Sequence, residues 1–312
     1  MRKIRVLLSL PNQNRYQQAQ MEAASAKAVE FDMDIRLLDA ENDAVNQSQQ
    51  ILKVLQSRSE SRPDAILVEP LTSTALGKVA EAAVASGIGW VALNTQPEYV
   101  EDLRAKAKAP IFAITRDHAE IGRIQGRQFA ALLPHGGTVL YVQGPSTSSA
   151  SAQRTSGMYS MKPENLSVRT LRSQWTEGSA QAAVRSWLML STSQPGSIDL
   201  VGCQYDGIAR GARQAFEEQT GEQRHTWLSL PSTGVDGLPD EGQVWVKRGE
   251  LTATVVAPIT TEIAMAKLMR AIDAGKQPEA LTFLELRSYP SLQELSKVGK
   301  QLESRKRIPA RQ

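Results

Sequence analysis

Residues 4–28 read IRVLLSLPNQNRYQQAQMEAASAKA, and this stretch decides the fold. The apolar run at 4–10 predicts a buried strand, and the Ala- and Gln-rich segment that follows predicts a helix. The short connection between them carries hydrogen-bonding side chains, where Gly and Ser would turn the chain more easily: Asn12, Gln13, Asn14, Arg15 and Tyr16. Either this turn is simply solvated, or something binds at the carboxyl end of the first strand.

The alternation of apolar strand and amphipathic helix continues along the chain. Strands are predicted at 4–10, 34–38, 65–68, 90–93, 111–115, 138–143, 167–172, 198–203, 226–230, 251–256 and 281–286. Between most of them the apolar residues have helical spacing, as in Ala180, Ala183, Val184, Trp187 and Leu188. Strands that alternate with helices imply parallel sheets with right-handed crossovers. The predicted fold class is therefore α/β, doubly wound.

Two sheets are expected, because a single sheet of so many strands would be unusual. A long polar connection, TQPEYVEDLRAKAKAP at 95–110, interrupts the rhythm after the fourth predicted strand. The alternation restarts at Ile111, which favours a division of the chain near this point.

The composition describes a globular protein, with 41% apolar and 22% charged residues among 312. A net charge of +3 is too small over this length to argue for nucleic-acid binding. Its visible source is the end of the chain, 297–312, where six basic residues face the single acid Glu303. We expect 299–312 to form a solvated basic tail.

No segment approaches the roughly 20 apolar residues that a transmembrane helix needs. The first apolar run ends at Leu10, and Pro11 and Asn12 do not form a small-residue cleavage site, so no signal peptide is predicted. We therefore expect a cytoplasmic protein if the chain is complete as written, and a periplasmic or other extracytoplasmic one if a leader has been removed.

Enzyme motifs are not found. The sequence has no GxGxxG after a strand, no Walker loop and no GxSxG elbow. Its three His and the lone Cys203 supply no triad, disulfide or metal cluster. Glu69 and Asp236 could serve as acid and base, but nothing in the sequence fixes their distance. We expect no catalytic activity, no cofactor and no metal.

Polar and aromatic residues follow the predicted strands, where α/β sheets bind ligands. The connections in the first half are PNQNRY, EPLTST and NTQ, and those in the second half are GPSTSSASAQRTSGM, SQWTEGS, QYDG and STGVDGLP. Aromatic faces beside amides and carboxylates suit a polyhydroxylated ligand, whose C–H faces pack on rings while its hydroxyls bridge donors and acceptors.

Several motifs together carry a family resemblance. They are SLPNQNRY at 9–16, DAEND at 39–43, DAILVEP at 64–70, DHAEIGRIQGRQFAALL at 117–133, QYDGIARGARQAF at 204–216, GVDGLP at 234–239 and GELTATVVAP at 249–258. In this order and spacing the set resembles the type I periplasmic binding protein superfamily. That superfamily includes ribose-type sugar-binding proteins and the effector domains of lactose-repressor-type regulators.

The resemblance implies two doubly wound lobes joined by three crossovers, with ligand between them. The N-terminal lobe would comprise 1–113 and 258–284, and the C-terminal lobe 114–257 and 285–298, followed by the tail 299–312. Hinges would lie near 113–116, 256–259 and 284–287, and ligand would shift the equilibrium toward a closed form.

The resemblance also implies ligand-binding residues, which match Asn12 or Gln13, Tyr16, Arg154, Trp175 and Asp236. Two departures concern the same site. The acidic-basic pair typical after the fourth strand is Asn94-Thr95 here, and the asparagine of an Asn-Asp pair is Tyr205. These differences favour a ligand other than a monosaccharide held by a charged clamp, such as a different sugar, a cyclitol, a nucleoside or a signalling molecule.

Each of these residues also has a structural interpretation. Asn12 could merely end a strand, Tyr16 and Trp175 could be packing residues, and Arg154, in a Ser-rich loop, could pair with a surface carboxylate. Asp206 is expected to cap the helix that it opens. Gly122 and Gly126 are expected to allow close helix packing.

Three functions follow from these observations. The first is a solute-binding protein that delivers a sugar-like ligand to an ABC transporter permease or a sensor protein, and it is the one that we expect. The alternative is an intracellular ligand sensor related to repressor effector domains, without a DNA-binding domain and without direct nucleic-acid contact. In the third, the fold has been adapted to catalysis.

Overall fold

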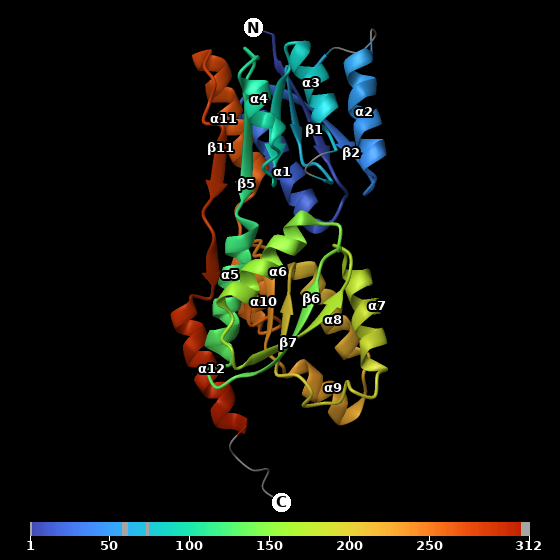
Figure 1. Cartoon of the computed structure of the whole chain (residues 1–312), viewed down its shortest axis with the longest axis vertical. Helices are drawn as coiled ribbons and strands as arrows, with labels where there is room; N and C mark the ends of the chain where they lie inside the picture. The colour runs from blue at the N-terminus through green and yellow to red at the C-terminus, as the bar shows by residue number, and fades with distance from the viewer. Residues whose placement is uncertain (1, 58–61, 73–74, 307–312) are drawn as a thin grey trace, which may run out of the picture. The chain divides into compact units, whose positions relative to one another are not determined.

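The computed structural model describes residues 2–57, 62–72 and 75–306 (Figure 1). The chain forms two compact lobes and passes between them three times. One lobe comprises Met1–Arg116 and Pro258–Leu284, and the other comprises Asp117–Ala257 and Glu285–Gln312. The first crossover follows Arg116, whereas the sequence placed it after residue 113. The reason is that β5 (Ile111–Arg116) continues to Arg116 as a buried strand.

The N-terminal lobe has a sheet of six parallel strands in the order β11-β5-β4-β3-β1-β2. Besides β5, these strands are β1 (Ile4–Leu10), β2 (Met33–Asp39), β3 (Ala65–Val68), β4 (Gly89–Leu93) and β11 (Leu281–Leu284). The central strands β3 and β4 are buried along their whole length, as expected for strands covered on both faces.

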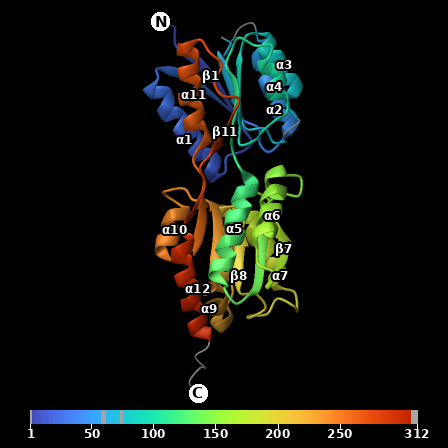
Figure 2. The same ribbon diagram turned by 60° about the vertical axis from the view of Figure 1, so that its left-hand side comes forward.

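Helices cover both faces of this sheet (Figure 2). Apolar residues of α1 (Arg15–Glu30) and α11 (Thr260–Ala274) share one core cluster with the sheet, among them Ala24 and Leu268. The other core cluster includes residues of α2 (Ala44–Gln56), α3 (Gly77–Ala85) and α4 (Tyr99–Arg104). Helix α4 occupies the polar connection 95–110, so the interruption that suggested a division of the chain lies inside this lobe.

The C-terminal lobe has a second six-stranded sheet, in the order β12-β10-β9-β8-β6-β7. The strands are β6 (Gly137–Gln143), β7 (Leu166–Arg172), β8 (Leu200–Cys203), β9 (Ser232–Asp236), β10 (Ala253–Val256) and β12 (Arg287–Tyr289). All pairs are parallel except β10 with β12, which is antiparallel. The doubly wound α/β class predicted from the sequence is confirmed in both lobes.

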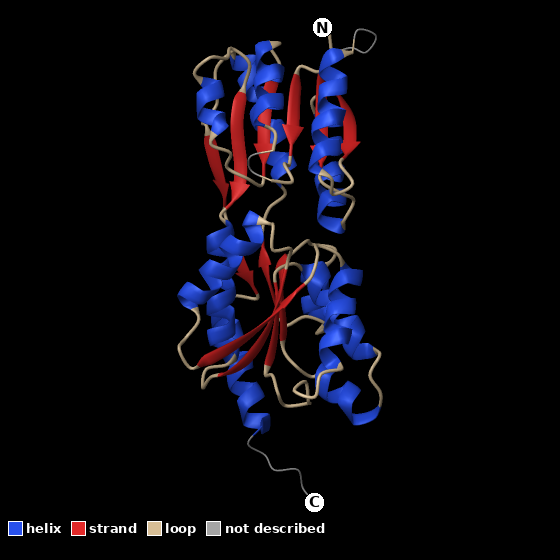
Figure 3. Cartoon of the chain, turned by 45° about the vertical axis from the view of Figure 1, so that its right-hand side comes forward, coloured by secondary structure: helices blue, strands red, loops and turns tan. Residues whose placement is uncertain are grey.

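Helices also lie on both sides of the second sheet (Figure 3). One core cluster contains residues of α5 (His118–Leu132), α6 (Ser149–Met161) and α12 (Leu292–Lys306). The remaining helices are α7 (Glu177–Leu188), α8 (Asp206–Glu217), α9 (Gly221–Leu228) and α10 (Gly242–Arg248). None of the helices within the described ranges is long and apolar enough to cross a membrane.

Two sequence predictions in this lobe are wrong. The strand predicted at 226–230 is largely helix α9, because Trp227 is buried there and stacks on Phe216 of α8 at 5.5 Å between ring centroids. The true strand, β9, is rich in small polar residues and gave no strand signal. The tail predicted from residue 299 is helical as far as Lys306, since Val298 and Leu302 of α12 pack on the core. Residues 307–312 lie outside the described part of the chain.

Helices α5 and α6 pack closely at three glycines, and this packing positions Arg154, a residue of the candidate site described below. A methyl group added at Gly122 would overlap the carbonyl oxygen of Arg154, and one added at Gly157 would overlap that of Ala119. A methyl group at Gly126 would lie 2.8 Å from the carbonyl oxygen of Met158. The close packing predicted for Gly122 and Gly126 is confirmed.

We predict that Gly157→Ala destabilises the protein by about 1–3 kcal/mol, because the added methyl group must push α6 away from α5. Gly178 in α7 is the matched control, since nothing lies within 4 Å of a methyl group added there. Gly178→Ala should be neutral or stabilising by up to about 1 kcal/mol, because Ala favours a helix over Gly. Urea unfolding measures both, and equal effects of the two substitutions would contradict this packing.

Candidate functional site

The N-terminal lobe gathers polar residues at the carboxyl ends of three neighbouring strands. Glu69 follows β3, Asn94 follows β4 and Arg116 ends β5, and these strands are adjacent in the sheet. Tyr16 enters the same group from the first turn of α1, whose N-cap is Asn14. Parallel pairing thus brings together side chains that are far apart in the sequence.

Hydrogen bonds join these residues into one network. The Asn94 Nδ2 donates to Glu69 Oε2 at 2.6 Å, and Gln17 Nε2 donates to Glu69 Oε1 at 3.0 Å. The Tyr16 hydroxyl donates to Asn94 Oδ1 at 3.3 Å. Asn94 holds this position with a backbone φ of 55°, a left-handed conformation that asparagine tolerates better than most residues.

The network contains one acid and one base. Burial raises the pKa of the Glu69 carboxyl, although the hydrogen bond from Asn94 and the positive charge of Arg116 act in the opposite direction. Arg116 is buried, and its guanidinium lies 4.3 Å from the centroid of the Tyr16 ring, in a cation–π arrangement. An acidic and a basic residue, which the Asn94-Thr95 pair lacks, are therefore present at the ends of the strands to either side of β4.

The structure does not join Asn12 and Gln13 to this network. The Asn12 amide donates to Asn42 Oδ1 at 2.8 Å, and the Gln13 amide donates to Asp39 Oδ2 at 2.7 Å, so the two side chains reach toward the end of β2 and the segment that follows it. Thr95 is half-buried beside Asn94. Of the predicted ligand residues in this lobe, Tyr16 and Asn94 thus lie together.

In the C-terminal lobe, Arg154 lies in helix α6 and not in the loop that the Ser-rich sequence suggested. Ser148 caps this helix by accepting from the Ser151 N–H, which starts the helix early in the Ser-rich segment. Arg154 is buried, and its Nη1 donates to the carbonyl oxygen of Gln204. Its guanidinium lies 5.5 Å from the centroid of the Trp175 ring.

Trp175 is half-buried in the connection from β7 to α7. Its indole packs so closely on Gly144 that a methyl group at that glycine would overlap the ring. The backbone of the β6–α6 connection therefore forms a platform for the indole, and Trp175 and Arg154 are brought together as ring and cation.

Gln204 holds the surrounding connections in place. Its side-chain oxygen accepts from the Gly144 N–H at 2.9 Å and from the Ser151 hydroxyl at 2.8 Å. Its Nε2 donates to the Thr155 hydroxyl at 2.9 Å and to the Tyr141 hydroxyl at 3.2 Å. Because Gln204 is fully buried and satisfied on both atoms, it fixes the end of β8 relative to α6.

Asp236 ends β9 and is buried, with a backbone φ of 105° that strains a non-glycine residue. Tyr205, also buried, precedes α8. Asp206 does not cap α8 as expected. Its carboxyl accepts from the Gly237 N–H at 2.8 Å and from the Thr254 hydroxyl at 2.8 Å, so it ties α8 to the segments after β9 and within β10.

Comparison with known proteins places this architecture in a family. The family described as the periplasmic binding protein domain matches residues 6–277. The chain belongs to this family. Among the residues that the structure describes, no group of three or more His, Cys, Asp or Glu side chains could hold a metal ion.

Individual members of the family share modest sequence identity with this chain. The xylitol-binding protein of Mycolicibacterium smegmatis is 26% identical over 230 residues, which are 72% of this chain and 59% of that protein. The ribose import binding protein of Bacillus subtilis is 27% identical over 225 residues, which are 72% of this chain and 66% of that protein. The chain thus spans less than two thirds of these curated relatives.

A solved solute-binding protein of an ABC transporter from Actinobacillus succinogenes, with bound D-allose, has the same fold. Its TM-score is 0.78 at 18% identity, and the match covers 96% of this chain and 100% of that one.

Three residues at these strand ends are not among the ligand-binding residues predicted from the sequence. Glu69, Arg116 and Gln204 each end a buried strand or directly follow one. A polar residue at the end of an apolar run is the sequence signal that could have found them. The hydrogen-bond partners of each residue, however, depend on the order of the strands in the sheet.

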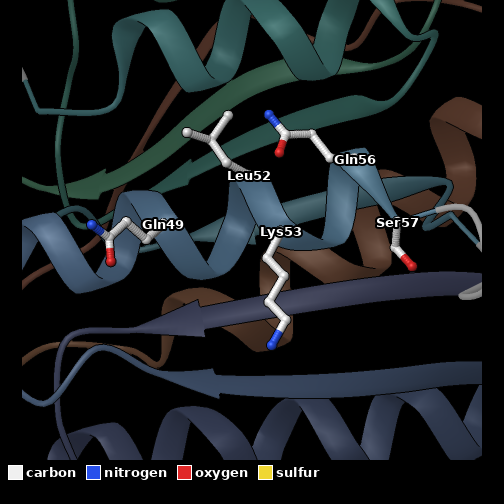
Figure 4. Close-up of a pocket in the computed structure, with 5 residues that line it drawn as sticks. All are labelled: Gln49, Leu52, Lys53, Gln56 and Ser57. Carbon is white, nitrogen blue, oxygen red and sulfur yellow. The ribbon is translucent and has the colours of Figure 1, made fainter.

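A surface depression lies elsewhere, on α2 of the N-terminal lobe (Figure 4). Gln49, Leu52, Lys53, Gln56 and Ser57 line it, and all of them come from α2 or the residue that follows it. None of the predicted ligand residues of this domain is among them, so the depression is separate from the networks described above.

The buried carboxyl of Asp206 allows a prediction of how the free energy of unfolding depends on pH. Burial raises its pKa well above the ordinary value of 3.8, and the nearby negative charge of Asp236 adds to the rise. The unfolded chain then releases the Asp206 proton at lower pH than the folded protein does. The free energy of unfolding should therefore fall as the pH rises from about 4 toward the native pKa.

We expect Asp206→Asn to reduce this pH-dependent loss of stability, because the amide does not titrate, and its oxygen can still accept from the Gly237 N–H. Asp206→Ala should cost about 1–3 kcal/mol, since it leaves the Gly237 N–H and the Thr254 hydroxyl without their acceptor. Urea unfolding at a series of pH values tests both, with the exposed Asp273→Asn as control. An unchanged pH dependence in Asp206→Asn would contradict this role of the carboxyl.

Proposed function

We propose that this protein reversibly binds one small polyhydroxylated ligand, a sugar or a polyol, through polar and aromatic residues at the carboxyl ends of its strands. The observation that supports this most is the repetition of one arrangement. Each lobe places a buried arginine against an aromatic ring and has a carboxylate at the end of a strand in the same lobe: Arg116, Tyr16 and Glu69 in one lobe, and Arg154, Trp175 and Asp236 in the other.

This arrangement matches the chemistry of a carbohydrate. Guanidinium N–H groups donate to hydroxyl oxygens, carboxylates accept from hydroxyl hydrogens, and ring faces pack against C–H bonds. Rigid backbone at the strand ends holds these groups in place before the ligand arrives, which lowers the entropy cost of binding.

The relatives support the same class of ligand, because proteins named for xylitol and for ribose import are similar over 72% of this chain. We infer from them that this protein acts by binding and not by turnover. Its partner would be an ABC transporter permease or a sensor that recognises the ligand-bound form.

Binding would be coupled to movement of the lobes. The chain crosses between them after Arg116, Ala257 and Leu284, so three short segments would act as hinges. A ligand that binds one arrangement of these hinges more tightly than another shifts the population to that arrangement.

A thermal-shift assay tests the proposal. Ribose, D-allose, xylitol, cyclitols and nucleosides are added to the purified protein, and we expect a sugar or polyol to raise its melting temperature. At about a hundred times its dissociation constant the ligand adds about 2.7 kcal/mol of stability, a shift of a few degrees for a chain of this size.

Trp175→Ala should abolish this shift while leaving the unliganded melting temperature close to that of the wild type, because Trp175 is only half-buried. Tyr159→Ala is the control, since Tyr159 is an exposed aromatic residue of α6. The proposal fails if no sugar or polyol stabilises the wild type, or if Trp175→Ala responds like the wild type.

A further inference from the structure

Helix α11 begins directly after the second crossover between the lobes. This crossover lies between Ala257 and Pro258, and α11 starts at Thr260. The first N–H groups of a helix have no partner within the helix, and the residue before the helix usually supplies an acceptor. In α11 that residue is Ile259, whose apolar side chain cannot accept a hydrogen bond. The start of α11 therefore needs an acceptor from another segment.

Gln20 of the neighbouring helix α1 supplies this acceptor (Figure 2). Its side-chain oxygen accepts from the Thr261 N–H at 3.0 Å, and its Nε2 donates to the Thr260 hydroxyl at 2.6 Å. The Thr261 hydroxyl donates to the backbone carbonyl oxygen of Gln20 at 2.7 Å. All three residues are fully buried, so water does not compete for these hydrogen bonds. Gln20 thus caps α11 from a different helix.

Gln20 is also connected to the candidate site. It forms a side-chain hydrogen bond with Glu69, the carboxyl that also accepts from Gln17 and Asn94. Gln20 lies one helical turn after Tyr16 and Gln17, and therefore on the same face of α1. A single side chain thus joins the network at the strand ends to the first turn after the second crossover.

The chain on the other side of this crossover is held by the second sheet. The Ala257 N–H donates to the carbonyl oxygen of Asp236 at 3.1 Å, which extends the parallel pairing of β10 with β9. Pro258 and Ile259 separate this anchored end from the first turn of α11. A displacement of that turn must therefore change the backbone angles of these two residues or move the C-terminal lobe.

We propose that Gln20 couples ligand binding in the N-terminal lobe to the second crossover, as a positioning residue for the movement of the lobes. This inference rests on the proposed function. A ligand that shifts Glu69 changes a hydrogen bond that Gln20 shares with it, and the same side chain holds the start of α11. Because no water replaces a lost partner of a buried amide, a shift at one end costs free energy unless the other end follows.

Pulsed EPR distinguishes this coupling from a cap that only stabilises the fold, because it measures the distribution of distances between the lobes. Spin labels are attached at Val29→Cys and Met189→Cys, two exposed positions in different lobes. Cys203 is buried, which raises the pKa of its thiol and keeps it unlabelled.

Three variants are compared with the doubly labelled parent protein. Gln20→Met removes both ends of the connection with little change in volume. Thr260→Val removes a hydrogen bond at the α11 end and leaves the contact between Gln20 and Glu69 in place. Gln125→Met is the matched control, because Gln125 is equally buried and its hydrogen bond with the Tyr141 hydroxyl lies within the C-terminal lobe.

We expect Gln20→Met and Thr260→Val to broaden or shift the distance distribution of the ligand-free protein, and Gln125→Met to keep that of the parent. D-ribose, D-allose, xylitol and myo-inositol are then titrated. The compound that changes the parent distribution should need about fivefold higher concentration in Gln20→Met and in Thr260→Val, as the loss of one buried hydrogen bond would give.

The outcomes separate this inference from the proposed function. If a compound changes the parent distribution and needs the same concentration in both variants, Gln20 is a structural cap, the inference is wrong and the proposed function stands. The inference is also wrong if a compound binds the parent without changing its distribution. If the parent binds none of the compounds, both proposals fail. Urea unfolding confirms that each variant is folded, and Thr260→Val alone decides the question if Gln20→Met is not.

Discussion

The parallel pairing of the strands controls where the polar residues of this protein lie. It delivers the carboxyl ends of β3, β4 and β5 to one edge of the first sheet, and those of β6, β8 and β9 to one edge of the second. Residues there are too enclosed to rely on water alone, so each buried polar group needs a partner from a neighbouring strand end. The networks around Glu69 and Gln204 are the consequence.

These networks contain two kinds of residue. Gln204 and Asp206 are fully enclosed and use their oxygens to hold backbone N–H groups and hydroxyls of adjacent segments. They give the strand ends a fixed geometry. Arg154, Trp175 and Asp236 lie beside that framework, and we propose that they contact the ligand. The close crossing of α5 and α6 at Gly122 and Gly157 belongs to the framework as well, because it sets the position of Arg154.

The amino-acid sequence alone predicts much of this fold, because buried strands and amphipathic helices leave periodic signals. It fails at β9, where Ser232, Thr233 and Gly234 lack apolar character, and at α9, where Trp227 suggested a strand but stacks on Phe216. It places Arg154 in a loop because local composition hides a helix that packing stabilises. The partnership of Glu69, Asn94 and Arg116 has no local signal, since it arises only from the order β5-β4-β3 in the sheet.

Native mass spectrometry of the intact protein tests the central claim most directly, because it counts the molecules bound to each chain and gives their mass. The protein is mixed with a panel of neutral polyols, sugars, their acids, amino acids and nucleosides at micromolar concentration. Binding of one sugar or polyol per chain is the predicted result. Binding of an amino acid or a nucleoside in its place, or of no compound even at millimolar concentration, would contradict it.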